Sequence, residues 1–127
     1  MRKFKTKLFN RWAVKEGLTD AVLLSALKEI VQGLVDANLG GHVYKKRVRM
    51  DGRGKRGGAR TLIAYKAKDK AFFIYGYAKN EKENIEQKAL EVLKELAANL
   101  LDYTEAQITK ALQSGELKEI EGDEEND

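Results

Sequence analysis

Hydrophobic and polar residues alternate along several short runs of the chain. Charged residues alternate with apolar residues or threonine over 3–8, which predicts a strand with one solvated face. Three further runs have the length and residue types of strands, at 43–50, 60–67 and 71–78. The last two are separated by residues 68–70, a connection whose length suits a hairpin.

Other stretches repeat with the period of a helix. Asn10 is expected to cap a short helix over 11–16 that ends at Gly17. Thr19 is expected to cap a stronger helix over 20–32, whose apolar residues keep helical spacing.

The second half of the chain holds two more helical patterns. Apolar residues at helical spacing make 84–101 the longest predicted helix, and Thr104 is expected to cap a final one ending near Ser114. Residues 38–41 are expected to form a turn.

The predicted order is therefore β-α-α-β-β-β-α-α, which indicates an α+β fold. We expect a small, mostly antiparallel sheet with the helices packed on one of its faces. A chain of 127 residues fits one domain, which we place at residues 1–115. The remaining residues, 116–127, carry seven acids and one lysine and are expected to form an acidic tail.

Composition excludes several classes of protein. The chain has no cysteine, which removes disulfide scaffolds and thiolate metal sites. No apolar run approaches the roughly 18 residues of a membrane helix, and the basic N-terminus lacks the apolar stretch of a secretory signal. We therefore expect a cytoplasmic protein that does not associate with membranes.

Charge is unevenly distributed. The net charge is +4, and since the tail carries −6, residues 1–115 carry +10. The densest stretch, 42–60, holds eight Lys or Arg against the single acid Asp51. Like charges repel and add nothing to a core, so this stretch predicts a polyanionic partner, nucleic acid above all. The tail is expected to be solvated; the alternative is that it covers the basic surface when the binding site is empty.

Strand alternation separates the cations of this stretch. In 43–50, Lys45, Arg47 and Arg49 point to one face. In 71–78, Phe72, Ile74, Gly76 and Ala78 suit the helical side, whereas Tyr75 and Tyr77 suit the other. With Arg60 at the start of the middle strand, the prediction is an open sheet face where cations hold phosphates and aromatic rings stack on bases. The alternative is a solvated face, or a second small core that contains the tyrosines.

The glycine-rich loop 51–58 differs from a nucleotide-binding loop. It lacks G-x-x-x-x-G-K-[ST] and joins two strands instead of a strand and a helix. Its glycines instead allow backbone N–H groups and flexible cations to approach a phosphodiester chain. His42, the single histidine, follows a Gly-Gly pair and is interpreted as a surface turn residue.

Three segments follow one another in order: K-K-R-V-R, G-R-G-K-R-G-G-A-R and F-F-I-Y-G-Y-A-K-N-E. Together with the preceding pair of helices, they resemble the RelE/HigB-type toxins of bacterial toxin–antitoxin systems over about residues 3–101. The resemblance implies a RelE-like toxin that enters the ribosomal A site and cuts mRNA without a metal or another cofactor. It also implies a cognate antitoxin, expected to be a small helix-turn-helix protein through which alone the pair would bind operator DNA.

Carried over by position, the family's cationic catalytic residues fall on Lys45, Arg47 and Arg60, and then on Lys79 or Asn80. Metal-independent cleavage of RNA uses the 2′-OH as nucleophile, and it needs a base, an acid and cations for the developing charge. Lys45 and Arg47 would supply charge, and Arg60 would clamp the scissile phosphate. The residues expected to bind RNA around them are Arg49, Arg53, Lys55, Arg56, Tyr75, Tyr77 and Asn80.

One catalytic role is left unfilled by the resemblance. Some relatives have a proton-transferring tyrosine in the final helix, where this chain has about Glu86. The substitutes left open are the lysines with ribosomal RNA groups, or one of Glu81, Tyr75, Tyr77 and Tyr103. Two other functions remain as alternatives: a ParE-type inhibitor of DNA gyrase that is not a nuclease, and a plain RNA-binding module.

Overall fold

The computed structural model describes residues 1–49, 58–78 and 85–122, which form four helices and six strands. The helices are α1 (Lys7–Glu16), α2 (Asp20–Val31), α3 (Gln87–Leu101) and α4 (Glu105–Ser114). The strands are β1 (Arg2–Thr6), β2 (Ala37–Gly40), β3 (Val43–Val48), β4 (Ala59–Lys66), β5 (Lys70–Ala78) and β6 (Leu117–Glu119).

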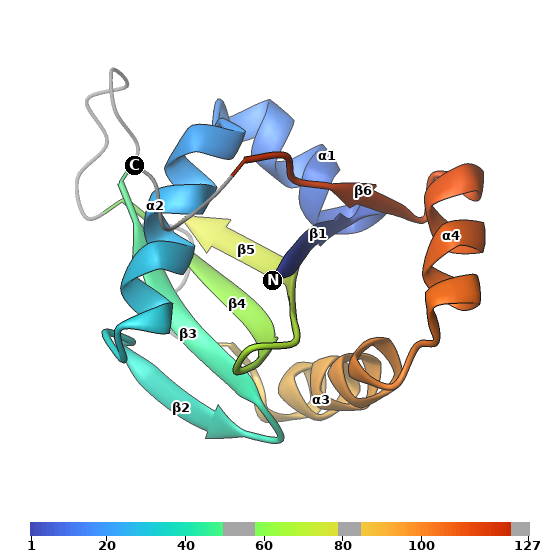
Figure 1. Cartoon of the computed structure of the whole chain (residues 1–127). Helices are drawn as coiled ribbons and strands as arrows, with labels where there is room; N and C mark the ends of the chain where they lie inside the picture. Colours follow the sequence, from blue (N-terminus) through green and yellow to red (C-terminus); the bar gives the residue numbers. More distant parts are fainter. Residues whose placement is uncertain (50–57, 79–84, 123–127) are drawn as a thin grey trace.

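All six strands belong to one sheet, in the order β2-β3-β4-β5-β1-β6 (Figure 1). β1 pairs with β5 in parallel, and the other pairs are antiparallel. The first and last strands of the chain thus lie together at one edge, and β2 forms the other. This architecture confirms the predicted α+β class with a mostly antiparallel sheet, and it is compatible with a RelE-like fold.

Helices cover both faces of the sheet, so the prediction of a single covered face is wrong. α1 and α2 pack against Val48, Ala59, Ile63 and Phe73, which form a core on what we call the α1 face. α3 and α4 pack against side chains from the opposite side of the same strands, on what we call the α3 face. Figure 1 shows the two pairs of helices on different sides of the sheet. Because both sides of β4 and β5 are buried, these strands are apolar almost throughout rather than alternating.

A bulge in β5 changes which side chains face which core. The register passes from Leu62 opposite Tyr75 to Ile63 opposite Phe73, so one residue of β5 is skipped. Regular alternation predicts Phe72 and Ile74 on the same side as Gly76 and Ala78. That placement is wrong, because Phe72 and Ile74 belong to the core of the α3 face. An extra residue in one strand reverses the phase of alternation beyond it.

Local capping signals set most helix ends as expected. Thr19 caps α2 through Val22, Thr104 caps α4 through Gln107, and Gly17 ends α1 in the left-handed region. The start of α1 is different: Thr6 caps it, with its hydroxyl accepting from the amide of Phe9, so the predicted cap at Asn10 is wrong. The helix therefore begins at once where β1 ends.

Two short strands were not predicted. Residues 37–40 form the edge strand β2 instead of a turn, and the reversal to β3 falls on Gly40, Gly41 and His42, all with positive φ. His42 is an exposed turn residue, as predicted. β6 falls inside the acidic segment 116–127 and pairs with β1.

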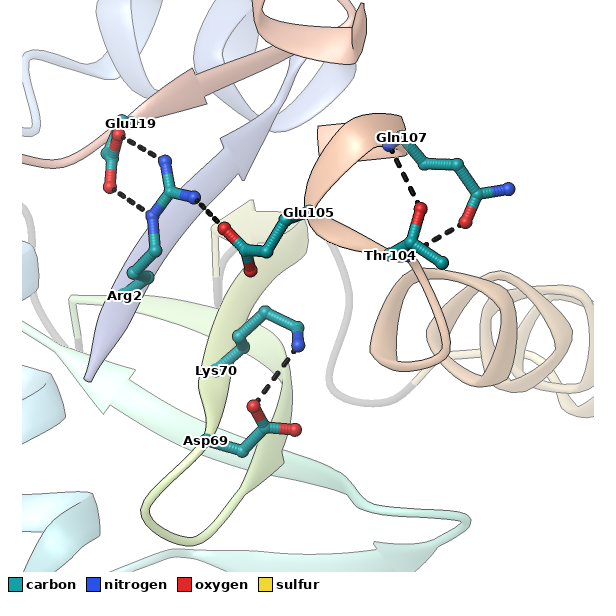
Figure 2. A network of polar contacts seen from close by, with 7 residues as sticks. All are labelled: Arg2, Asp69, Lys70, Thr104, Glu105, Gln107 and Glu119. Atoms are coloured by element: carbon teal, nitrogen blue, oxygen red, sulfur yellow. Dashed lines mark hydrogen bonds and ion pairs between the residues drawn. The ribbon is translucent and has the colours of Figure 1, made fainter. Parts of the chain in front are cut away.

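Polar contacts fasten the C-terminal strand and helix to β1 (Figure 2). The guanidinium of Arg2 donates from Nε and Nη2 to the carboxylate of Glu119 at 2.9 and 2.8 Å, and from Nη1 to Glu105 at 2.8 Å. The hydrogen bonds from Arg2 lower the pKa of the Glu119 carboxyl below its ordinary value. The side chains of Leu117 and Ile120 are buried, so apolar packing and a bidentate ion pair together hold this segment.

Candidate functional site

Cations and tyrosines line up across three adjacent strands on the α3 face. In one row, Arg47 of β3 lies opposite Arg60 of β4, which lies opposite Tyr77 of β5. In the next row, Lys45 lies opposite Leu62, which lies opposite Tyr75. Residues directly opposite each other in such a sheet have Cβ atoms about 5 Å apart. We call these lines the two rows; they bring together five of the residues that the sequence singled out.

Exposure differs along the rows. Arg47 is exposed, Lys45 and Tyr75 are half-buried, and Arg60 is only 9% exposed. Tyr77 is 2% exposed, so its ring does not present a face to solvent in this conformation. The predicted open face is therefore corrected: Arg60 and Tyr77 lie within the protein, and Arg47 stands at its surface. Arg49, one residue beyond β3, is also exposed.

The end of β3 is held by side chains from neighbouring segments. The carboxylate of Asp36 accepts a hydrogen bond from the backbone N–H of Arg47, and the backbone N–H of Asp36 donates to the carbonyl of Lys45 at 2.9 Å. On the other side, the hydroxyl of Thr61 donates to the carbonyl of Lys46 at 2.9 Å. The backbone that carries Lys45 and Arg47 is therefore fixed from both sides. Sequence reasoning missed Asp36, although it is the single acid between α2 and the basic strand.

Glycine is required where β4 begins. Gly58 has φ +62, and a Cβ on it would lie 2.4 Å from the carbonyl oxygen of Val48. Neither the left-handed conformation nor the close approach to the backbone of β3 tolerates a side chain. Gly58 thereby brings β4 alongside β3, which sets Arg60 opposite Arg47.

Several residues with proposed roles lie outside the described part of the chain. They are the loop cations Arg53, Lys55 and Arg56, and the residues that follow β5, namely Lys79, Asn80 and Glu81. Their roles remain predictions from the sequence.

Tyr103, one of the open proton-transfer candidates, lies away from the two rows. Its hydroxyl donates to Glu116 at 3.1 Å, next to β6, and the strands β1 and β5 separate β6 from β4. Burial, followed by that hydrogen bond, raises the pKa of Tyr103 above its ordinary value. Position and pKa both argue against Tyr103 as a base for a group bound at Arg47 and Arg60, whereas Tyr75 lies in the row of Lys45.

Within 1–49, 58–78 and 85–122, no three His, Asp or Glu side chains are grouped as ligands of a metal ion would be. In the same part of the chain, no helix combines the length and apolar character needed to cross a membrane.

The fold and the two rows define a small α+β protein that gathers arginine, lysine and tyrosine on three strands of one sheet face. A family model described as the RelE toxin of the RelE / RelB toxin-antitoxin system matches residues 1–120. The chain therefore belongs to the RelE toxin family, as the sequence predicted. The match extends beyond the 3–101 of the predicted resemblance and takes in α4 and β6. Neither the curated proteins nor the solved structures compared with the chain gave a match.

Family membership has two direct consequences. The protein is the toxin of a toxin–antitoxin system, and its partner is a cognate antitoxin of the RelB type.

Proposed function

We propose that this toxin is a ribosome-dependent mRNA endoribonuclease and that the two rows form its active site. The observation that carries the proposal is the pairing of Arg47 with Arg60. A phosphodiester accepts bidentate hydrogen bonds from arginine, and two arginines that lie opposite each other offer it donors from both sides.

The cleavage step follows from the chemistry of RNA. A base takes the proton of the ribose 2′-OH, and the oxygen attacks the adjacent phosphorus. The bond from phosphorus to the 5′-oxygen breaks, and an acid protonates that oxygen, which leaves a 2′,3′-cyclic phosphate and a 5′-hydroxyl end. Negative charge accumulates on the phosphoryl oxygens in the transition state, where fixed cations stabilise it.

Four of the row residues have a part in this proposal. Arg60, buried and therefore fixed in direction, clamps the scissile phosphate. Arg47, exposed at the edge, meets the approaching chain first and adds charge to the transition state. Lys45 contributes charge and carries a proton, and Tyr75, in the same row, is the hydroxyl best placed to exchange one. Lys79 and Asn80 would complete the site from beyond β5.

Other parts of the proposal concern partners. Arg49, with the loop cations Arg53, Lys55 and Arg56, would hold the RNA backbone on either side of the cut. The ribosome would present the mRNA, and the antitoxin, proposed to be a helix-turn-helix protein, would block the rows and carry the complex to its operator DNA. Cytoplasmic mRNA would be the substrate, and no metal or other cofactor is proposed.

Mapping 5′-hydroxyl ends of mRNA in cells that express the toxin inducibly tests this function. We expect cuts within translated messages, and Arg47→Ala should reduce their number by about 100-fold, the effect of removing one group that stabilises transition-state charge. Because Arg47 is exposed, the variant should fold. Arg11→Ala, an exposed arginine on α1, removes the same charge from the opposite face and should cut like the wild type.

Two outcomes contradict the proposal. Intact mRNA together with DNA damage would indicate the gyrase-directed alternative. Intact mRNA and unaffected growth would indicate a binding module without catalysis.

A further inference from the structure

The outer edge of β3 changes its partner between Lys45 and Arg47. β2 pairs with β3 only from Val43 to Lys45, and the last pair joins Lys45 to Ala37. Alternate residues of a strand direct their backbone N–H and C=O groups to the same side, so those of Arg47 point to the side of β2, as those of Lys45 do. In the described part of the chain, no strand pairs with Arg47 on that side. The backbone of this arginine therefore lies at an edge of the sheet, just past the end of β2.

The side chain of Asp36 takes the place of a strand at this edge. Its carboxylate accepts a hydrogen bond from the backbone N–H of Arg47, and its own backbone N–H donates to the carbonyl of Lys45 at 2.9 Å. A paired strand would form these two bonds with its backbone alone. A hydrogen bond to a carboxylate is stronger than one between neutral groups. Asp36 thus continues the hydrogen-bond ladder of β2 by one step, to the residue that carries the exposed guanidinium.

The segment that leads to Asp36 is held independently of the Asp36 side chain. The backbone N–H of Leu34 donates to the carbonyl of Glu29 at 2.9 Å, and the carbonyl of Leu34 accepts from Nζ of Lys46, also at 2.9 Å. The ammonium of Lys46 contacts the carboxylate of Glu29 as well, and only 10% of the Lys46 side chain is exposed. α2, the segment and β3 are therefore joined two residues before Asp36. Removing the carboxylate of Asp36 should leave this connection in place.

Arg47 has more to gain from such a bond than Arg60, the arginine opposite it. Arg60 is 9% exposed, so its surroundings restrict its direction, whereas Arg47 is exposed. The rotamers open to a side chain depend on the φ and ψ of its own residue, and a hydrogen bond on the N–H restricts that backbone. A catalytic group displaced by about 1 Å can cost about 100-fold in rate. A bond to the backbone of Arg47 can therefore influence a reaction that the carboxylate itself does not touch.

We propose that Asp36 is a positioning residue, which holds Arg47 in place opposite Arg60 for the scissile phosphate. The inference rests on the proposed nuclease function. An oxygen acceptor at this point is what the site needs from Asp36; neither its charge nor a proton on it takes part. Asp36→Ala should lower the maximal rate of cutting about tenfold, because water can replace the acceptor without fixing its position. That is less than the roughly 100-fold expected for Arg47→Ala. Asp36→Asn keeps an oxygen acceptor and should retain most of the rate.

Single-turnover cutting of mRNA on programmed ribosomes by the purified toxin tests the inference. Asp36→Ala should lower the rate at saturating toxin and leave the toxin concentration for half of that rate within about twofold, since the bond acts on the transition state. In an Arg47→Ala background, Asp36→Ala should cause no further loss, because Asp36 acts through Arg47. Asp102→Ala removes an exposed carboxylate at the end of α3 and should cut like the wild type.

Three outcomes in this assay overturn the inference while the nuclease function stands. An unchanged rate for Asp36→Ala would show that Arg47 needs no such support. An equal loss in Asp36→Asn and Asp36→Ala would show that the charge or a proton of the carboxylate matters, not its position as acceptor. An equal loss with and without the guanidinium of Arg47 would show that Asp36 acts by another route.

If the wild type does not cut mRNA, the nuclease proposal fails, and the hold of Asp36 on Arg47 is decided separately. Amide hydrogen exchange of the purified toxin measures it, with the amide of Leu62 in β4 as the reference. Exchange at Arg47 should be about tenfold faster in Asp36→Ala than in the wild type, and close to the wild type in Asp36→Asn. Equal exchange at Arg47 in all three proteins would overturn the inference.

Discussion

Replacing Gly76 by alanine would place a methyl group inside the ring of Trp12. A Cβ built on Gly76 lies 2.2 Å from Cζ3, 2.4 Å from Cε3 and 2.7 Å from Cη2 of that ring. Carbon atoms in contact are about 3.5 Å apart, so the ring would have to move by more than about 1 Å. Trp12 also packs beside Phe9, with ring centroids 5.6 Å apart. The ring thereby links α1 to β5 at Gly76, the residue between Tyr75 and Tyr77 in the sequence.

The size of the effect follows from two opposing terms. Forcing an extra methyl group into a packed site costs about 1 to 3 kcal/mol. Alanine restricts the unfolded chain more than glycine does, which stabilises the protein by about 0.4 to 1 kcal/mol. We therefore expect Gly76→Ala to lower the free energy of unfolding by about 1 to 2 kcal/mol. For a domain of this size, that corresponds to a fall in Tm of about 4 to 8 °C.

A double-mutant cycle measures the clash, with the free energy of unfolding of the wild type, both single variants and the double variant determined in urea. Trp12→Leu removes the ring atoms that the new methyl would meet, so Gly76→Ala should cost clearly less in that background than in the wild type. The coupling between the two changes should be about 1 kcal/mol or more. The packing argument would be refuted if Gly76→Ala left the urea midpoint unchanged. It would also be refuted if the substitution lowered the free energy of unfolding equally in the wild type and in Trp12→Leu.

Two further predictions concern stability. Gly58→Ala should lower the urea midpoint more than Gly33→Ala does. Both glycines have positive φ, but only a Cβ on Gly58 would collide with a backbone atom, the carbonyl oxygen of Val48. Equal falls in the midpoint would contradict this clash. Glu119→Gln should lower the free energy of unfolding by about 0.5 to 1 kcal/mol at pH 7, since the partner Arg2 is partly exposed. The native pKa of Glu119 is lowered, so this stabilisation is complete above the ordinary value of 4.5 and disappears as the pH falls through the native pKa. A difference between the two proteins that persists in acid would contradict it.

Signals within a few residues of one another allowed most elements to be predicted. Thr19 and Thr104 accept from amides three residues ahead, so their capping role is visible without knowledge of the fold. At the start of α1 two capping residues compete, Thr6 and Asn10. The pairing of β1 with β5 and β6, which ends at Thr6, decides between them, and that pairing is not local.

The missed features depend on how strands pair, which the residue types of a single segment do not show. β2 has the sequence A-N-L-G, whose Asn and Gly disfavour strands, and it forms because β3 supplies a partner. β6 lies among acidic residues and forms because Arg2 and the edge of β1 hold it. The bulge in β5 reverses the alternation on which the assignment of Phe72 and Ile74 rested. The cationic rows were predictable because β3 and β4 pair without such a break.

The cations of the sheet and its edge differ in whether the described residues supply them with a partner. Three lysines of the strands on the α1 face have partners from the same chain: Lys5 contacts Asp20 at 2.7 Å, Lys46 contacts Glu29, and Lys3 donates to the carbonyl of Gly122 at 2.7 Å. Arg47 and Arg49 differ, because within the described residues neither guanidinium forms an ion pair. This difference supports the proposal that Arg47 and Arg49 bind an anion from outside, such as the phosphates of mRNA.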